Sequence, residues 1–127
     1  MNRVVHFEIH AENPDKAVKF YSEVFGWKFY KWDGPMEYWM ITTGEDDSPG
    51  INGGMMRREG PIDGEAVIAY VCVIEVKNID EMTSSVSANG GKIVVPKTAI
   101  PGIGWSVYCK DTEGNIFGMM EDDPEAA

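Results

Sequence analysis

The sequence predicts an α+β protein built from two tandem βαβββ modules within one domain, residues 1–127. Three observations lead to this fold class. A chain of 127 residues is the size of one ordinary domain with one core. Each half begins with a strand pattern followed by a helix pattern and three further extended segments. Several features of the first half recur in the second at one fixed spacing.

The first module, residues 1–62, begins with a strand at residues 3–11, where apolar and polar side chains alternate as in a half-buried strand. A helix over residues 14–25 follows. Asn13 is its expected N-cap, Pro14 suits the first helical position, and Gly26 ends it. Three extended segments separated by turn-forming residues complete the module, at residues 27–32, 37–44 and 51–58.

The second module, residues 63–127, repeats this plan. An apolar strand at residues 66–76 precedes a helix over 78–89, for which Asn78 and Glu81 are the expected capping box. Three more strands are expected at residues 92–95, 104–111 and 115–122. The boundary between the modules is placed in the EGPIDGE stretch, residues 59–65.

The fixed spacing relates positions across the two modules. It places Gly26 on Gly90 and Gly54 on Gly118. At the same spacing His6 falls on Tyr70, and an alignment shift of one residue would place it on Val71 instead. One register that holds at a helix end and again in a late strand indicates internal duplication.

Charge and composition exclude several classes of partner. The chain carries 11 lysines and arginines against 21 acidic residues, a formal net charge of −10. Nucleic acid and anionic membranes are repelled by such a charge, so a small neutral or cationic molecule is the expected partner. The cysteines, Cys72 and Cys109, lie far apart, which favours a reducing cytoplasm over a disulfide framework. The longest apolar run, residues 66–74, is too short to span a bilayer.

Three stretches carry a resemblance to a known family: VVHFEIHAENPDKAVKFYSEVFGW, INGGMM and PKTAIPGIGWSVYCKDTEGNIFGMME. They resemble the vicinal oxygen chelate superfamily, which includes glyoxalase I, extradiol dioxygenases and bleomycin-binding proteins, and within it a glyoxalase-like group of unsettled substrate. The resemblance covers the whole chain. It implies that the strands of both modules form one shared cup-shaped sheet with the helices outside, and that metal ligands come from the first and last strands of each module.

The resemblance places the four family ligand positions on His6, Gly54, Tyr70 and Gly118. Glycine has no side-chain donor, and a catalytic metal generally needs about three nitrogen or oxygen ligands. His6 is then the only retained ligand, and no cofactor is expected. A weaker two-ligand site remains open, since Glu8 shares a strand face with His6 and His10 and lies within reach of either.

Strand alternation and the repeat direct a set of side chains into the expected cup. His6 and Tyr70 are candidate catalytic residues there, because an imidazole and a phenol can act as an acid–base pair; hydrogen bonding without catalysis is the alternative. The candidate ligand-binding residues combine polar groups, two glycines that widen the space, and aromatic or thioether side chains that suit a flat apolar ligand: His6, Glu8, Trp39, Gly54, Met56, Tyr70, Cys72, Trp105, Gly118 and Met120. For each tryptophan, ordinary core packing is the competing interpretation.

The sequence therefore favours a glyoxalase- or bleomycin-resistance-like protein that binds a small organic ligand between its modules, with the family metal site lost. Two enzymatic alternatives remain: a metal-dependent lyase or dioxygenase, and a metal-free acid–base enzyme that uses His6 and Tyr70. A homodimeric interaction module without a ligand is a third possibility. Homodimerisation is expected in each case, because the resemblance implies it and because four tryptophans leave apolar surface to spare.

Overall fold

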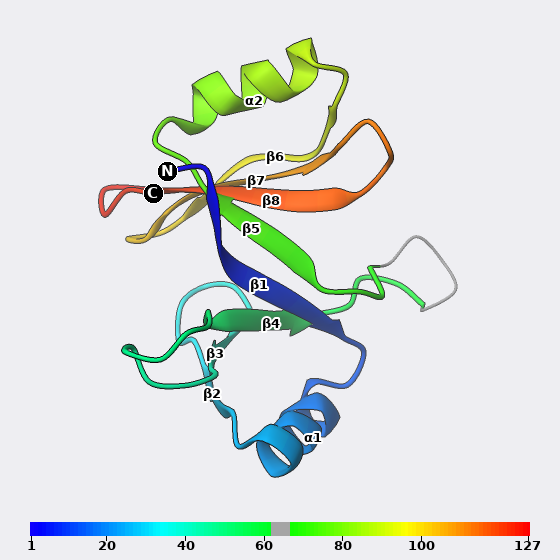
Figure 1. The fold of residues 1–127 in the computed structure, drawn as a ribbon, viewed down its shortest axis with the longest axis vertical. Coiled ribbons are helices and arrows are strands. Elements are labelled where there is room, and N and C mark those ends of the chain that lie inside the picture. The colour runs from blue at the N-terminus through cyan, green and yellow to red at the C-terminus, as the bar shows by residue number, and fades with distance from the viewer. Residues whose placement is uncertain (62–66) are drawn as a thin grey trace. The chain divides into compact units, whose positions relative to one another are not determined.

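The structure, a computed structural model, describes residues 1–61 and 67–127 (Figure 1). The chain divides into two compact units. One contains residues 6–71, and the other contains residues 1–5 together with residues 72–127. The predicted module boundary at residues 62 and 63 lies outside the described residues, and a cup shared by the two modules stays a prediction.

The first unit contains one helix, α1, and a four-stranded arrangement in the order β2-β3-β4-β1, to which β1 contributes its residues from His6 onward. Strands β1 and β4 are parallel, and the other pairs are antiparallel. The element bounds are β1 Arg3–Ala11, α1 Pro14–Phe25, β2 Lys28–Lys31, β3 Trp39–Thr42 and β4 Gly53–Arg57. The core of this unit lies on the side of the strands that α1 covers, where Phe7, Ile41 and Met55 are buried.

The second unit repeats the arrangement with the strand order β5-β8-β7-β6 and the helix α2. Strands β5 and β8 are parallel, like β1 and β4. The bounds are β5 Val71–Glu75, α2 Ile79–Ala88, β6 Lys92–Ile100, β7 Gly104–Lys110 and β8 Ile116–Asp122. Helix α2 runs over the β6–β8 strands (Figure 1) and encloses a core that includes Ile79, Val107 and Met119.

The predicted fold class is confirmed, because both halves show the βαβββ order. The expected helix caps are also present. Asn13 accepts a hydrogen bond from the Lys16 amide at 3.2 Å, and Gly26 ends α1 with φ of 73°. Asn78 likewise caps α2 by accepting from the Glu81 amide at 3.0 Å. Neither helix in the described part of the chain has the length and apolar content needed to cross a membrane.

Two strands differ in extent from their predictions. Strand β5 begins at Val71 although the apolar pattern begins at residue 66, so Tyr70 lies just before the strand. Strand β6 continues to Ile100, beyond its predicted end at residue 95. Two register irregularities occur along its pairing with β7, and the second, between Val95 and Thr98, includes Pro96, which lacks an amide hydrogen for a regular ladder.

Candidate functional site

A chain of three hydrogen-bonded polar side chains lies on the face of the first unit opposite its core. His6 and Glu8 come from β1, and Tyr38 comes from the residue before β3. The Tyr38 hydroxyl donates to Glu8 Oε2 at 2.9 Å and lies 2.8 Å from His6 Nε2. Glu8 is only 5% exposed, so its carboxylate is a buried polar group held by hydrogen bonds. We refer to His6, Tyr38 and Glu8 as the polar trio.

Gly54 lies on β4 directly beneath the Tyr38 ring. It pairs with Glu8 of β1 and with Met40 of β3, between which it lies. A Cβ atom on Gly54 would overlap the Tyr38 hydroxyl and ring. The absence of a side chain at Gly54 therefore gives Tyr38 the room to reach both of its partners.

The hydrogen-bond chain determines the protonation of His6. A phenol has one hydrogen, and Tyr38 donates it to Glu8, so Nε2–H of the imidazole donates to Tyr38 Oη. Burial lowers the pKa of His6, and the Glu8 carboxylate opposes this effect only in part. His6 is therefore a neutral imidazole at pH 7 with its Nδ1 lone pair available as a base or a hydrogen-bond acceptor.

We expect the free energy of unfolding to fall as the pH drops from 7.5 to 5. Burial lowers the pKa of His10 as well as that of His6. Between each lowered value and the ordinary value near 6.5, the unfolded chain binds more protons than the folded chain, so acid favours unfolding. Urea unfolding across this range tests the expectation. A His6→Gln/His10→Gln variant should give a flatter dependence, and an unchanged slope would contradict the assignment.

The expected pairing of His6 with Tyr70 is wrong. The Tyr70 hydroxyl donates to the Tyr21 hydroxyl of α1 at 2.6 Å, and its ring stacks on Phe7 with centroids 5.6 Å apart. Phe7 points toward the helix, away from the polar trio. Burial and the bond to Tyr21 raise the pKa of Tyr70 to about 12, so it is a poor acid at neutral pH.

The placement of Cys72 on the glycine face is also wrong, and strand register explains both errors. Glu8 pairs with Gly54 in the first unit, whereas Val73, not Cys72, pairs with Gly118 in the second. The first strands of the two modules are therefore offset by one residue more than the last strands. A shift of one residue turns every side chain of a strand to the opposite face. The structural counterpart of His6 is therefore Val71, one residue after the Tyr70 position that the fixed spacing gives.

Both tryptophans expected to line the cup pack in cores instead. Trp39 is buried against the core of the first unit, and Lys31 Nζ lies 5.3 Å from its ring centroid. Trp105 packs on the core under α2 and donates from Nε1 to Asp123 at 2.9 Å. Met56 and Met120 lie on the glycine face of their strands, while the neighbouring Met55 and Met119 are in the cores.

The sequence did not point to Tyr38, because the neighbouring Trp39 was expected to line the cup. Adjacent residues of a strand face opposite sides, so a Trp39 in the cup would place Tyr38 on the helix side. In the structure Trp39 lies in the core on the helix side and Tyr38 lies on the opposite face. The tendency of tryptophan to be buried was the available signal: it favours Trp39 in the core and therefore Tyr38 on the opposite face.

The second unit has a related contact at Gly118. A Cβ atom on Gly118 would lie 3.1 Å from the Tyr108 ring and 3.3 Å from Val73.

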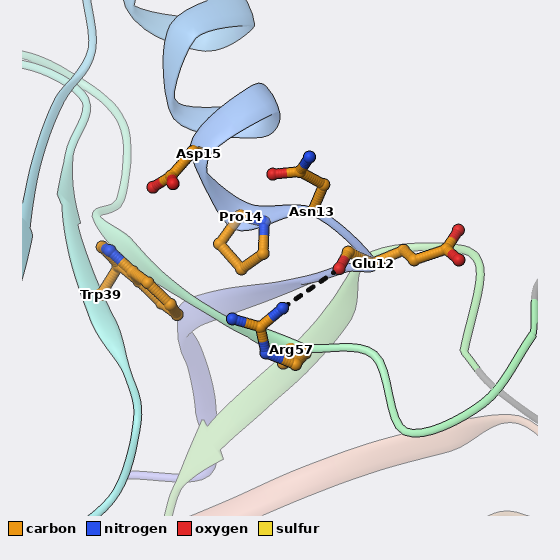
Figure 2. Close-up of a pocket in the computed structure, with 6 residues that line it drawn as sticks. All are labelled: Glu12, Asn13, Pro14, Asp15, Trp39 and Arg57. Atoms are coloured by element: carbon orange, nitrogen blue, oxygen red, sulfur yellow. Dashed lines mark hydrogen bonds between the residues drawn. The ribbon is translucent and has the colours of Figure 1, made fainter.

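A shallow pocket of about 480 Å³ lies on the other side of the first unit (Figure 2). It is lined by Glu12, Asn13, Pro14, Asp15, Trp39 and Arg57, at the start of α1. Arg57 donates to the Glu12 carbonyl at 3.3 Å and forms an ion pair with Glu37 at 2.9 Å. None of the polar trio lines this pocket, so its volume is separate from the chemistry of His6.

The residues at the family metal positions do not fit a divalent metal. The described residues contain no group of three or more histidine, cysteine, aspartate and glutamate side chains that is able to hold one ion. Gly54 and Gly118 offer no donor, and Val71 stands where a second histidine would be needed. His6 Nε2 is already engaged with Tyr38. This donor set lacks the three ligands that a catalytic metal generally requires.

Comparisons with known proteins bear on the fold and on the resemblance seen in the sequence. Residues 3–44 match the family model for the bleomycin resistance protein-like N-terminal region. A hypothetical protein from Bacillus halodurans is similar in structure, with a TM-score of 0.69, 20% identity, and coverage of 99% of this chain and 98% of that chain. No curated protein matches the sequence significantly.

Two solved methylmalonyl-CoA epimerases have the same fold. The enzyme from Mycobacterium tuberculosis gives a TM-score of 0.66 at 16% identity, covering 95% of this chain and 88% of that chain. An epimerase in complex with methylmalonyl-CoA and NH4+ gives a TM-score of 0.68 at 14% identity, covering 100% and 99%. The chain therefore shares the fold of these epimerases, and the family-model match over residues 3–44 supports the resemblance noted in the sequence.

Proposed function

We propose that this chain binds a small neutral or cationic organic molecule at the polar trio, without a metal. The hydrogen-bonded chain from His6 through Tyr38 to Glu8 is the observation that carries the proposal. It presents a neutral imidazole beside a buried carboxylate on a strand face where Gly54 makes room for the Tyr38 ring. Such a small set of oriented polar groups is what gives an organic ligand its orientation in a binding site.

The charge of the site favours a neutral or cationic ligand over an anionic one. Glu8 is the only formally charged member of the trio, and the whole chain carries −10. One solved structure with this fold contains methylmalonyl-CoA, so the fold accommodates an organic ligand in that protein. The acidic character of this chain supports a ligand without negative charge here.

A thermal-shift screen of small organic amines and neutral aromatic compounds tests the binding proposal. Compounds that bind only the folded chain raise its melting temperature by mass action. We expect these shifts to persist in Tyr70→Phe, the matched control, and to disappear in His6→Ala and Tyr38→Phe. If both trio variants keep every shift shown by the wild-type chain, the ligand binds elsewhere and the proposal is wrong.

A metal-free acid–base enzyme is the second candidate, with Tyr38 in place of Tyr70 as the partner of His6. Its specific support is the position of Tyr38 between the two other groups. His6 Nδ1 would accept a proton from the substrate, and the Tyr38–Glu8 hydrogen bond would stabilise the imidazolium that forms. Turnover by wild-type protein that is lost in His6→Gln would favour this candidate over simple binding.

We also propose that the family position holds no divalent metal. Dialysed protein, purified without a histidine tag, should contain far less than one equivalent of zinc, nickel, manganese or iron, because one histidine and its neighbours bind such ions too weakly to retain them. Elemental analysis measures this directly. A near-stoichiometric metal that disappears in His6→Ala would restore the metal-dependent lyase or dioxygenase alternative.

Two broader expectations belong to the same proposal. A cytoplasmic location is supported by the two cysteines, since Cys72 is exposed, Cys109 is buried, and both are free thiols. A homodimer is the proposed assembly, and the exposed aromatic side chains of α1 support it.

A further inference from the structure

The outward side of α1 is unusually apolar for a solvent-facing helix. Phe20 is 55% exposed and Val24 is 56% exposed, although helix residues of this type normally point into a core. The core-facing side of α1 is formed by other residues, among them Ala17, Val18 and Tyr21. The Phe20 and Tyr21 rings are perpendicular to one another, with centroids 5.2 Å apart, and more than half of the Phe20 side chain is still exposed.

The charged residues beside Phe20 follow a simple order along the helix. Lys16 lies one turn before Phe20, and Glu23 lies about one turn after it, both exposed and on the same side. The outward face therefore reads positive, apolar, negative from its N-terminal to its C-terminal end. Lys16 and Lys19 are balanced within α1 by Asp15 and Glu23, so the helix is electrically neutral in a chain whose net charge is −10.

We propose that a second copy of this chain covers this surface, with the two α1 helices packed antiparallel across a twofold axis next to Phe20. In that arrangement Lys16 of each copy lies opposite Glu23 of its partner, because the two positions are nearly equidistant from Phe20. The two Phe20 rings meet at the centre. An isologous contact of this kind needs a self-complementary surface, and the positive–apolar–negative order provides one.

The charge of the chain selects a second copy over other partners. A basic protein would be drawn to the acidic remainder of the surface, not to its neutral helix. Two copies with a net charge of −10 each repel one another over most approaches, and a neutral apolar face is where that repulsion is weakest. Phe25, 60% exposed at the end of α1, and Tyr30, 69% exposed on β2, provide further apolar area in the same unit.

Light scattering after size-exclusion chromatography of the full chain tests the surface directly. Wild-type protein should have the mass of two chains at micromolar concentration. Phe20→Asp should raise the dimer dissociation constant by at least about tenfold, as expected for a central aromatic contact. Far-UV circular dichroism verifies that the variant retains its fold. Lys92→Glu, an exposed charge change on β6, is the control that should leave the mass unchanged.

A charge exchange identifies the antiparallel arrangement and does not depend on Phe20→Asp. Lys16→Glu alone and Glu23→Lys alone each place like charges opposite one another twice and should weaken the dimer. Mixing these two variants should restore it, because the mixed dimer pairs opposite charges at both ends. The double variant Lys16→Glu/Glu23→Lys should likewise be dimeric.

The inference rests on the proposed homodimer, and the outcomes separate the two. A wild-type chain that is monomeric at micromolar concentration would overturn both. A wild-type dimer that persists in Phe20→Asp, or single-charge variants that are not rescued by mixing, would overturn the α1 contact and leave the homodimer with another interface.

Discussion

Tyr38→Phe is expected to lower the free energy of unfolding by about 1–3 kcal/mol, although the change removes a single oxygen atom. The hydroxyl donates to a carboxylate that is only 5% exposed and accepts from His6, so its loss takes a hydrogen-bond partner from two groups. Phenylalanine retains the ring over Gly54, which excludes a cavity as the cause. Chemical denaturation of the two proteins at pH 7 measures the difference.

Tyr70→Phe is the matched control for this prediction. It also removes one phenol oxygen, but the Tyr70 side chain is half exposed and its partner is another hydroxyl. We expect its cost to stay below about 1 kcal/mol, since water replaces the lost hydrogen bond. Equal losses in the two variants, or a larger loss in Tyr70→Phe, would show that Tyr38 does not hold the polar trio together.

Gly54→Ala should be more damaging than Tyr38→Phe. The new methyl group would occupy the position of the Tyr38 hydroxyl and ring, so the tyrosine must move and both of its hydrogen bonds break. Overpacking of this kind costs about 1–3 kcal/mol in addition to the lost hydrogen bonds. Denaturation measures the stability, and the His6 side-chain signals in nuclear magnetic resonance spectra report the displacement.

Two comparisons make this second prediction specific. Gly118→Ala adds the same methyl group at a position where the nearest atoms are 3.1 and 3.3 Å away, so a small adjustment suffices and the loss should be smaller. In a Tyr38→Ala/Gly54→Ala variant the clash is absent, so the double change should cost less than the sum of the single changes. Strict additivity would mean that the two residues do not compete for the same space.

The elements of this fold were predictable from sequence because their signals are local. Asn13 and Gly26 mark the ends of α1 through the hydrogen bonds and backbone angles that they adopt within a few residues. The polar trio was predictable only in part. His6 and Glu8 share a strand and therefore a face, whereas Tyr38 reaches them from a distant part of the chain, and no local pattern reports such a contact.

The errors in the site arose from register, which depends on long-range pairing. The fixed spacing that relates Gly54 to Gly118 also related His6 to Tyr70, which directly precedes the structural counterpart Val71. That single step exchanged the helix-facing and glycine-facing sides of β5 and carried Cys72 with it. In β3 and β7, Trp39 and Trp105 lie on the helix-facing side because they pack against the two cores. That burial depends on how the helices pack over the strands, which is a long-range property.

The division of the chain into two units has a consequence for its folding. Residues 1–5 belong to the same unit as residues 72–127, and the Asn2 amide donates to the Glu75 carbonyl at 2.8 Å. During synthesis residues 1–5 leave the ribosome before the second half of the chain, so they cannot complete their contacts until that half has emerged. Contacts so distant along the chain slow folding, because the entropy of closing a long loop is lost before the contact is gained. The start of β1 is therefore expected to be among the last segments of the chain to reach its final environment.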